Sequence, residues 1–309
     1  MDISLVITNW NGKELLKETL PTFIEASESD KENSYEIILI DDSSTDDSVD
    51  FVRKTYPEIK VFVTPENVGY IEASNYGVSR ASSPYVMFLN SDMKLSPDTV
   101  KLLSRHINNE GVFAVTPSVF DWEQKFQYGN RGGFFRLGHI FQYEKPINDT
   151  KTQSFFACGG AFLFKKDVYQ ELGGYDNNLF YPYYYEEIDI CYRALKRGYK
   201  IIYEPEARVY HKIRGTISRD RLFHEVRIIS GRNSYLFSWK NITDFDKVIS
   251  MIFFQPLFLI RDLFLLRFRF WKCFFRALPL LPLVLKKRKE EKKYFKLTDR
   301  KIFQKIKGS

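Results

Sequence analysis

Asn90, Ser91 and Asp92 directly follow the apolar run 86–89, and their types and spacing are suited to phosphate chemistry. A run that is apolar on both faces predicts a central strand of a covered parallel sheet. Ligands of such sheets bind beyond the carboxyl ends of the strands, where a carboxylate can hold a divalent cation against phosphate oxygens. The same three residue types also favour turns, so a plain turn is the alternative interpretation.

A second group of acids, Glu186, Glu187 and Asp189, falls in the first turn of a helix that the apolar spacing of residues 188–195 predicts. Acids there gain about 0.3–1 kcal/mol each from the helix dipole, and Asp189 could pair with Arg193 four residues on. At 100° per residue the three side chains point in different directions. At least one carboxylate can therefore face a cleft and act as a general base.

Two further residues are candidates for ligand contacts. Asp41 ends the predicted strand 36–40, where a carboxylate can accept hydrogen bonds from a nucleobase or ribose, or can form part of a turn. His211 follows a predicted strand and could bind a metal, although a lone histidine is more often structural.

The elements that would position these residues alternate between strand and helix over the first ninety positions. Strands are expected at 3–8, 36–40, 60–64 and 86–89, and helices at 12–26, near 49–52 and at 70–80. This order predicts βαβ units and a parallel sheet. Ser96 is expected to be the N-cap of the next helix, with Pro97 as its first residue.

The absence of two motifs narrows the function. The first strand is not followed by G-x-G-x-x-G, and the chain has no G-x-x-x-x-G-K-[ST]. These absences argue against a dinucleotide-dependent oxidoreductase and a P-loop NTPase.

Composition fits one large domain, with or without an appendage, because 309 residues with 44% apolar content can bury a full core. Three widely spaced cysteines indicate a reducing compartment. The N-terminus has no signal-peptide pattern and is expected to be a strand. Residues 261–309 hold 16 Lys and Arg against 4 Asp and Glu, whereas residues 1–260 hold 30 against 35. This division does not suit a nucleic-acid binder, which would be basic throughout.

The middle and the end of the chain lack the strand–helix alternation of the first ninety residues. Residues 121–150 are aromatic and aperiodic, as expected of a substrate-facing loop. In FFACGGAFLF (155–164), paired glycines would let backbone pass close to a ligand or a neighbouring segment.

Residues 248–285 are strongly apolar, but their longest charge-free run is 13 residues, too short to span a membrane. We expect residues 248–293 to dock on an anionic membrane surface, or to form a helical cap on the domain.

The segments SLVITNWNG, ILIDDSSTDDS, NVGYIEASNYG and YVMFLNSD together resemble the nucleotide-sugar half of family-2 glycosyltransferases, including rhamnosyltransferase-like and other cell-surface glycan enzymes. The resemblance covers residues 4–92. It implies an α/β fold of the GT-A type, Rossmann-like, with a mostly parallel central sheet and flanking helices. It also implies a nucleotide-sugar donor bound by Thr8, Asn9, Trp10, Asp41, Asn67, Gly69 and Asn90, although Gly69 also suits a loop.

Asn90 and Asp92 occupy the positions of the family's D-x-D motif. Asn90 departs from the usual Asp, so Asp92 is expected to carry most of the ligation of Mg²⁺ or Mn²⁺. Residues 173–211 resemble the acceptor-side E-D-x-D motif and the V-x-H that follows it. This resemblance implies that Glu187, in place of the commoner Asp, is the general base and that His211 is a metal ligand.

By the same resemblance, Glu186 and Asp189 would support the acceptor side. Residues 1–240 would form the catalytic domain, with 1–95 as its nucleotide-sugar half and 96–215 as its acceptor half. Residues 241–309 would form a basic, amphipathic helical tail that docks on the membrane.

The function implied is that of an inverting, metal-dependent glycosyltransferase that transfers a hexosyl or deoxyhexosyl group to a lipid-linked or cell-surface glycan. It would be a peripheral protein on the cytoplasmic face of the cell membrane. The alternatives are a non-enzymatic membrane scaffold and a sugar nucleotidyltransferase. The latter should have a Gly-rich basic loop after the first strand, and TNWNGKE has one Gly and one Lys.

Overall fold

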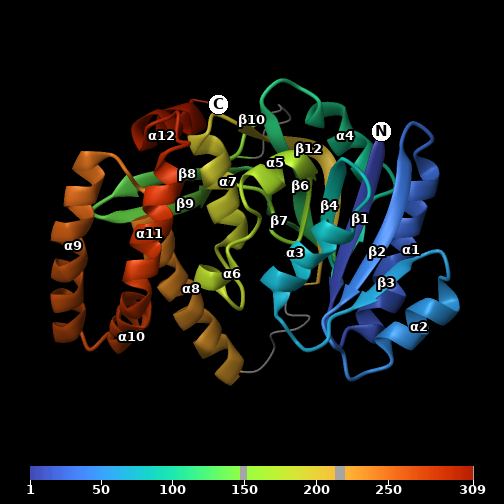
Figure 1. The fold of residues 1–309 in the computed structure, drawn as a ribbon, viewed down its shortest axis with the longest axis horizontal. Coiled ribbons are helices and arrows are strands. Elements are labelled where there is room, and N and C mark those ends of the chain that lie inside the picture. The colour runs from blue at the N-terminus through green and yellow to red at the C-terminus, as the bar shows by residue number, and fades with distance from the viewer. Residues whose placement is uncertain (147–151, 213–219, 309) are drawn as a thin grey trace.

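The computed structural model describes residues 1–146, 152–212 and 220–308 (Figure 1). Strands and helices alternate through the first part of the chain, which confirms the expected order. The elements are β1 (Asp2–Asn9), α1 (Lys13–Ser29), β2 (Ser34–Asp41), α2 (Ser48–Thr55), β3 (Lys60–Val63), α3 (Tyr70–Arg80) and β4 (Tyr85–Asn90).

The next part of the chain completes a mixed sheet. It contains β5 (Met93–Leu95), α4 (Thr99–Ile107), β6 (Val112–Asp121), β7 (Phe126–Tyr128), β10 (Thr152–Gln153), β11 (Ala161–Lys165) and β12 (Lys200–His211). The strand order is β10-β12-β6-β11-β4-β1-β2-β3, with β5 paired to β12 and β7 to β6. β4, β1, β2 and β3 are mutually parallel, whereas β11 runs antiparallel to both β4 and β6. The mostly parallel α/β architecture expected from the sequence is present.

Two local expectations were wrong. Helix α4 begins at Thr99, two residues later than expected, with Asp98 as its N-cap residue. Residues 121–150 are not a continuous loop, because β7 joins the main sheet and β8 (Arg131–Arg136) pairs with β9 (His139–Glu144) as a separate hairpin. The aromatic rings that obscured any strand pattern pack within this hairpin, where Phe134 stacks on Phe141.

Both faces of the sheet are covered. Leu5 and Ile7 of β1 belong to one buried cluster and Val6 to the other, since successive side chains of a strand point to opposite faces. Leu16 of α1 joins the first cluster, and Ile71 of α3 joins the second.

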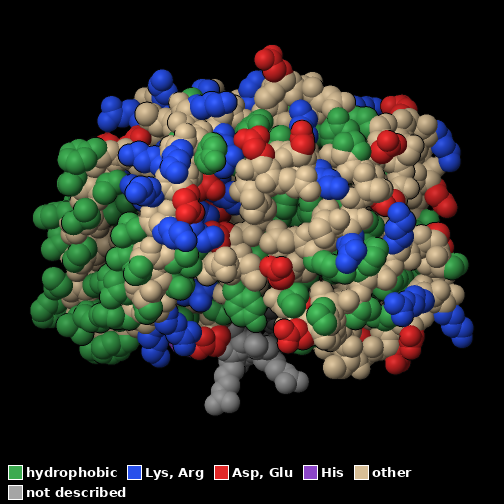
Figure 2. Space-filling view, in the orientation of Figure 1, with side chains coloured by type: hydrophobic (Ala, Val, Ile, Leu, Met, Phe, Trp, Pro, Cys, Tyr) green, Lys and Arg blue, Asp and Glu red, His purple; other side chains and the backbone are tan. Residues whose placement is uncertain are grey.

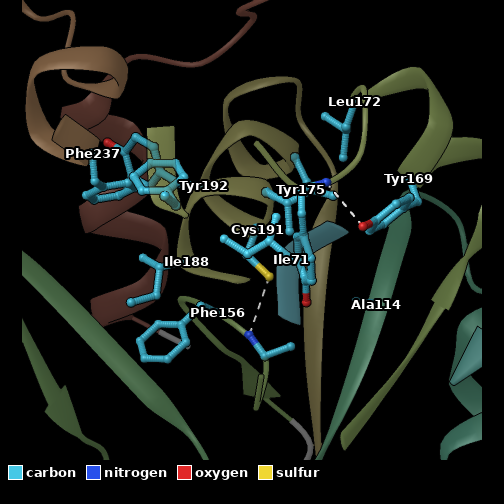
Figure 3. Packing of buried hydrophobic residues seen from close by; sticks show 14 of the residues in the cluster. Ile71, Ala114, Phe156, Tyr169, Leu172, Tyr175, Ile188, Cys191, Tyr192 and Phe237 are labelled. Atoms are coloured by element: carbon cyan, nitrogen blue, oxygen red, sulfur yellow. Dashed lines mark hydrogen bonds between the residues drawn. The ribbon is translucent and has the colours of Figure 1, made fainter. Parts of the chain in front are cut away.

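The second cluster extends into α7 (Glu186–Lys196), which follows α5 (Lys166–Glu171) and α6 (Asn177–Phe180). Its expected apolar stripe is confirmed, because Ile188, Cys191, Tyr192 and Leu195 are all buried. Figure 3 shows three of these side chains beside Phe156 and Phe237. The packing fixes how α7 is rotated about its axis, and therefore where its acidic first turn points.

The C-terminal part consists of α8 (Asp220–Asn241), α9 (Phe245–Phe264), α10 (Phe268–Ala277), a 3-10 turn (Leu278–Leu280), α11 (Leu281–Lys292) and α12 (Asp299–Lys307). Met251, Cys273, Val284 and Ile302 contribute to the same buried cluster as α7. The C-terminal helices therefore pack on the α/β part of the chain as a helical cap, with α9 on its outer side (Figure 1). Among the described helices, none combines the length and apolar character needed to cross a bilayer.

Candidate active site

Polar residues from three strands meet at one edge of the sheet. The parallel register pairs Asn9 with Asp41 and Thr8 with Asn90, so the ends of β1, β2 and β4 lie side by side. This is the edge where parallel α/β sheets bind ligands. The structure thus brings together four of the expected donor-binding residues.

Asp41 is fully buried, and neighbouring groups satisfy its carboxylate. Asn9 Nδ2 donates to Asp41 Oδ2 over 2.8 Å, and the Ser44 hydroxyl and backbone N–H donate at 2.7 and 2.8 Å. The other amide atom, Asn9 Oδ1, is buried and has no hydrogen-bond partner among the described residues. Asp41 therefore orients Asn9, whose oxygen is available to a donor molecule, and the half-exposed Trp10 ring lies next to it in the chain.

Asn67 and Gly69 lie in a loop that Asp42 organises. The Asp42 carboxylate accepts hydrogen bonds from the backbone N–H groups of Val68 and Gly69 at 2.8 and 2.9 Å, and Asn67 Nδ2 donates to the Asp42 carbonyl at 3.1 Å. Gly69 has a φ of +83°, which favours glycine. The structure gives Asn67 and Gly69 a loop-shaping role, and it adds Asp42, whose only signal in the sequence was its place beside Asp41.

Asp92 and His211 meet, although 119 positions separate them in the chain. Pairing of β12 with β5 sets His211 opposite Met93, and His211 Nε2 lies 3.4 Å from Asp92 Oδ2. Asp92 Oδ1 and Asn90 Oδ1 are buried and lack hydrogen-bond partners within the described ranges. These unsatisfied oxygens and the imidazole form a donor set that fits a divalent cation.

The described part of the chain holds no cluster of three or more His, Cys, Asp or Glu side chains arranged around a metal. Two such side chains and an amide oxygen are a sparse set. Sparse sets suit Mg²⁺ and similar cations, which keep several waters and bind substrate phosphates.

Gly159 and Gly160 connect this region to α7. The Asn90 N–H donates to the Gly160 carbonyl at 2.9 Å, and a Cβ on Gly160 would lie 2.9 Å from Asn90 Nδ2. A Cβ on Gly159 would lie 3.3 Å from the Glu187 side chain. Backbone therefore passes close to both Asn90 and Glu187, where a larger side chain would be crowded, as the paired glycines predicted.

Glu186 and Glu187 form a pair of carboxyl groups at the start of α7. Burial raises the pKa of both, and the neighbouring charge of Glu187 raises the pKa of Glu186 further. One oxygen of each carboxyl group is buried without a hydrogen-bond partner in the described structure. Tyr70 closes the site from α3 by donating to the Gly159 carbonyl at 2.7 Å. A proton-accepting carboxylate beside a phosphate-binding edge is the arrangement needed for group transfer to a hydroxyl.

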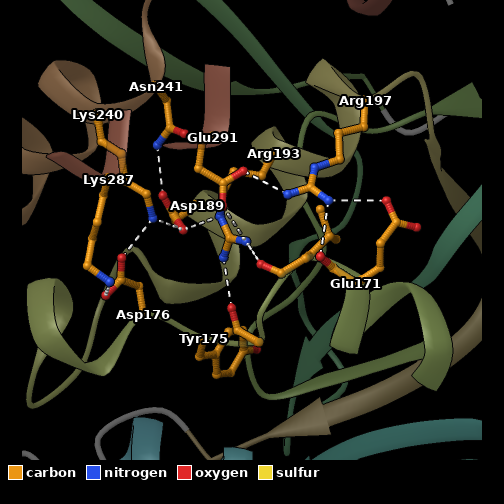
Figure 4. Close-up of polar contacts among 12 residues, drawn as sticks. Glu171, Tyr175, Asp176, Asp189, Arg193, Arg197, Lys240, Asn241, Lys287 and Glu291 are labelled. Atoms are coloured by element: carbon orange, nitrogen blue, oxygen red, sulfur yellow. Dashed lines mark hydrogen bonds and ion pairs between the residues drawn. The ribbon is translucent and has the colours of Figure 1, made fainter. Parts of the chain in front are cut away.

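Asp189 lies away from this pair, within the interface between α7 and α8. Its Oδ2 is 2.7 Å from Arg193 Nε and 2.9 Å from Lys240 Nζ, and Asn241 Nδ2 donates to Oδ1 at 2.7 Å (Figure 4). The expected pairing with Arg193 is confirmed. The carboxylate is wholly engaged in these contacts, so Asp189 supports the site by holding α7 in place and does not contact an acceptor.

Arg131, at the start of β8, is a site residue that the sequence did not reveal. Its guanidinium lies 4.6 Å from the Tyr128 ring centroid, and its Nη1 lies 3.1 Å from Glu144 Oε2. Burial raises the pKa of Glu187, and the charge of Arg131 partly offsets that rise. Arg131 belongs to the segment that was interpreted as a loop, so no strand pattern marked it.

The fold is of the GT-A type found in glycosyltransferases. Residues 4–173 match the model of the family described as "Glycosyl transferase family 2". The chain belongs to glycosyltransferase family 2.

Its relatives include the uncharacterized glycosyltransferase YwdF of Bacillus subtilis, 26% identical over 68% of this chain and 74% of the relative. Poly-beta-1,6-N-acetyl-D-glucosamine synthase of Staphylococcus aureus is 25% identical over 70% of this chain but only 51% of that enzyme. The crystal structure of GalNAc-T7 with UDP, GalNAc and Mn²⁺ superimposes with a TM-score of 0.60 at 20% identity, over 77% of this chain and 47% of that one.

Proposed function

We propose that the protein is an inverting, metal-dependent glycosyltransferase that moves a hexosyl or deoxyhexosyl group from a nucleoside-diphosphate sugar to a hydroxyl of a lipid-linked or cell-surface glycan. The observation that carries this proposal is the position of Glu187, separated from Asn90 only by the Gly159–Gly160 backbone. The glycan synthase among the relatives supports a cell-surface acceptor.

In this proposal the donor lies along the ends of β1, β2 and β4. Asn9 Oδ1 and the Trp10 ring face the nucleoside, and Asp92, His211 and Asn90 hold Mg²⁺ or Mn²⁺. That ion supplies Lewis-acid stabilisation of the charge on the departing diphosphate. The Mn²⁺ in the GalNAc-T7 structure supports this assignment.

Glu187 accepts the proton of the acceptor hydroxyl as the hydroxyl oxygen forms its bond to the anomeric carbon. The bond from that carbon to the diphosphate oxygen breaks on the opposite side, so the configuration inverts. The diphosphate leaves with the electron pair. Glu187 acts only while ionised, and the dipole of α7 together with Arg131 favours that form.

The test replaces Glu187 with Gln, which keeps the shape of the side chain and removes the base. We expect turnover to fall by about 10²–10⁴-fold, the usual contribution of general-base catalysis. Thermal stabilisation by UDP-, GDP- or dTDP-sugars with Mn²⁺ should be retained. The matched control is Glu58→Gln, at an exposed carboxyl group outside the site. Loss of donor binding in Glu187→Gln would instead place this residue on the donor side.

Two further assays on the wild type distinguish the glycosyltransferase from the two alternative functions. A scaffold would show no metal-dependent donor hydrolysis, and a nucleotidyltransferase would release pyrophosphate from a nucleoside triphosphate. Membership in family 2 favours the glycosyltransferase over both.

The proposal includes peripheral docking on the cytoplasmic face of the membrane through residues 248–293. Helix α9 packs on the protein through Met251, Gln255 and Leu259, yet its outward face is also apolar. The exposed large hydrophobic side chains of α9 are Phe245, Ile249, Ile252, Phe253, Leu257, Ile260, Leu263 and Phe264. Figure 2 shows hydrophobic side chains gathered at this end of the molecule. A helix whose outer face is apolar is expected to bury that face against another apolar surface. The arginines of α10 are suited to contact with anionic lipid headgroups at such a surface.

Sedimentation with phosphatidylglycerol vesicles tests this docking. The Ile252→Glu variant should bind the vesicles more weakly than the wild type, because it places a charge on a side chain that is 66% exposed. The control, Val63→Glu, alters an exposed apolar residue on β3, far from α9 (Figure 1). Equal binding by both variants and the wild type would exclude docking through α9.

A further inference from the structure

A cavity of about 410 Å³ lies between the start of α7, the hairpin β8–β9 and helices α8 and α10. None of the catalytic or donor-binding residues described above lines it. Six of its lining residues carry the argument: Tyr184, Tyr185, Arg227, Tyr235, Arg269 and Phe270. Tyr and Phe rings form part of the lining, and the cavity is formed by segments that are far apart in the sequence.

The cavity adjoins the general base. Tyr184 and Tyr185 line it and directly precede Glu186 and Glu187, and the charges of both glutamates contribute, after burial, to raising the pKa of Tyr184. Both tyrosines have a left-handed backbone, with φ of +72° and +76°. Such strained residues persist where the surroundings hold them, and they occur often at binding sites.

Asn233 of α8 supplies that support. Fully buried, its Nδ2 donates to the carbonyls of Phe180, Tyr183 and Tyr184 at 3.2, 3.0 and 2.8 Å. Helix α8 therefore fixes the turn that separates the cavity from the carboxyl pair. A molecule in the cavity would contact Tyr184 and Tyr185, the two residues that directly precede the carboxyl pair.

Two of the lining residues are cationic. Arg227 of α8 and Arg269 of α10 line the cavity, and no Asp or Glu is among the described lining residues. Guanidinium groups from two helices are suited to a phosphate, which arginine binds with paired hydrogen bonds.

Where α10 lines the cavity, exposed apolar side chains lie close by in the chain. Phe270 lines the cavity, and its neighbours Leu266 and Phe268 are 72% and 51% exposed. An apolar chain lying on α9 and α10 would thus end beside the two arginines. Its polar head would then lie between those arginines and Glu187.

We propose that this cavity binds the phosphate-bearing head of a lipid-linked glycan acceptor. The lipid chain lies on the outer face of α9 and α10, Arg227 and Arg269 hold the phosphate, and the tyrosines orient the sugar whose hydroxyl faces Glu187. This inference rests on the proposed function, because it names the acceptor of the same site.

The test measures binding of the full-length protein to neutral vesicles that carry a small fraction of an isoprenyl diphosphate. Vesicles in which phosphatidylglycerol supplies the same charge serve as the reference. The wild type should prefer the isoprenyl diphosphate by about tenfold or more, the factor expected from charge-assisted hydrogen bonds. The variant Arg227→Gln/Arg269→Gln should lose that preference. The matched control, Arg53→Gln/Arg105→Gln, removes two exposed arginines on α2 and α4 and should retain it.

Stabilisation by the nucleotide sugar shows that each variant is folded, and it separates the two proposals. Donor binding without any preference for the isoprenyl diphosphate would overturn the acceptor site and leave the proposed function standing. Absence of donor binding in the wild type would overturn the proposed function. An equal loss of the preference for isoprenyl diphosphate in the control variant would also refute a lipid-specific cavity. So would complete competition by free inorganic pyrophosphate against binding to the isoprenyl diphosphate vesicles.

Discussion

The buried ion network around Asp189 yields a stability prediction of defined size. Arg193, Lys240 and Asn241 all contact the fully buried carboxylate, and although burial opposes ionisation, these partners hold the pKa of Asp189 at about 2, below its ordinary 3.8. The pKa is depressed, so the stabilisation is present above the ordinary value and is lost as the pH falls toward 2. A shift of this size corresponds to about 2 kcal/mol at neutral pH.

The perturbation is Asp189→Asn, which keeps the size of the side chain and removes the charge. We expect the free energy of unfolding at pH 7 to fall by about 2 kcal/mol, and by up to about 3–5 kcal/mol if Arg193 and Lys240 are left uncompensated. Because the network joins α7 to α8, turnover should fall as well while donor binding is preserved.

The measurement is urea denaturation followed at pH 7, 5 and 4, with Glu58→Gln as the exposed control. The difference between the wild type and Asp189→Asn should be constant from pH 7 to 5 and should narrow below pH 4. The control should stay within about 0.5 kcal/mol of the wild type. A loss below 0.5 kcal/mol in Asp189→Asn, or a difference that widens in acid, would refute the reasoning.

Three further predictions concern the site itself. The variant Glu186→Gln should have a higher melting temperature than the wild type, and the difference should grow as the pH rises above 4.5. Burial raises the pKa of Glu186, so the wild type loses the stabilising protonated form of this carboxyl group as the pH rises, whereas Gln cannot ionise. A difference in melting temperature that shrinks with rising pH would contradict this prediction. The acid limb of the turnover profile should lie above pH 4.5, since burial raises the pKa of Glu187, and a limb at or below that value would exclude this residue as the base. The variant Asp92→Asn should need at least about tenfold more Mn²⁺ for half-maximal activity, equivalent to about 1.4 kcal/mol, and an unchanged metal requirement would remove Asp92 from the cation site.

Local patterns in the sequence determined the alternating strands and helices of the first ninety residues. The apolar run 86–89 and the strands before it are specified by short-range periodicity, and parallel pairing then brings their polar ends to one edge. For this reason Asp41, Asn90 and Asp92 could be placed at one edge from the sequence, whereas only the resemblance to family 2 indicated Asn9. The apolar stripe of α7 could be predicted for the same reason, because apolar residues three and four positions apart lie on one face of a helix.

Only the tertiary structure determined which groups each polar side chain contacts. Whether Asp189 faces an acceptor or an ion network depends on Lys240, which lies 51 positions further along the chain. Arg131 reaches the site only because the aromatic segment folds as a hairpin, and the cavity beside Glu187 exists only because α8 and α10 pack against that hairpin. Such contacts join residues that share no local pattern. Sequence periodicity therefore fixes the elements and their faces, whereas the partners of each charged group are set by packing between distant segments.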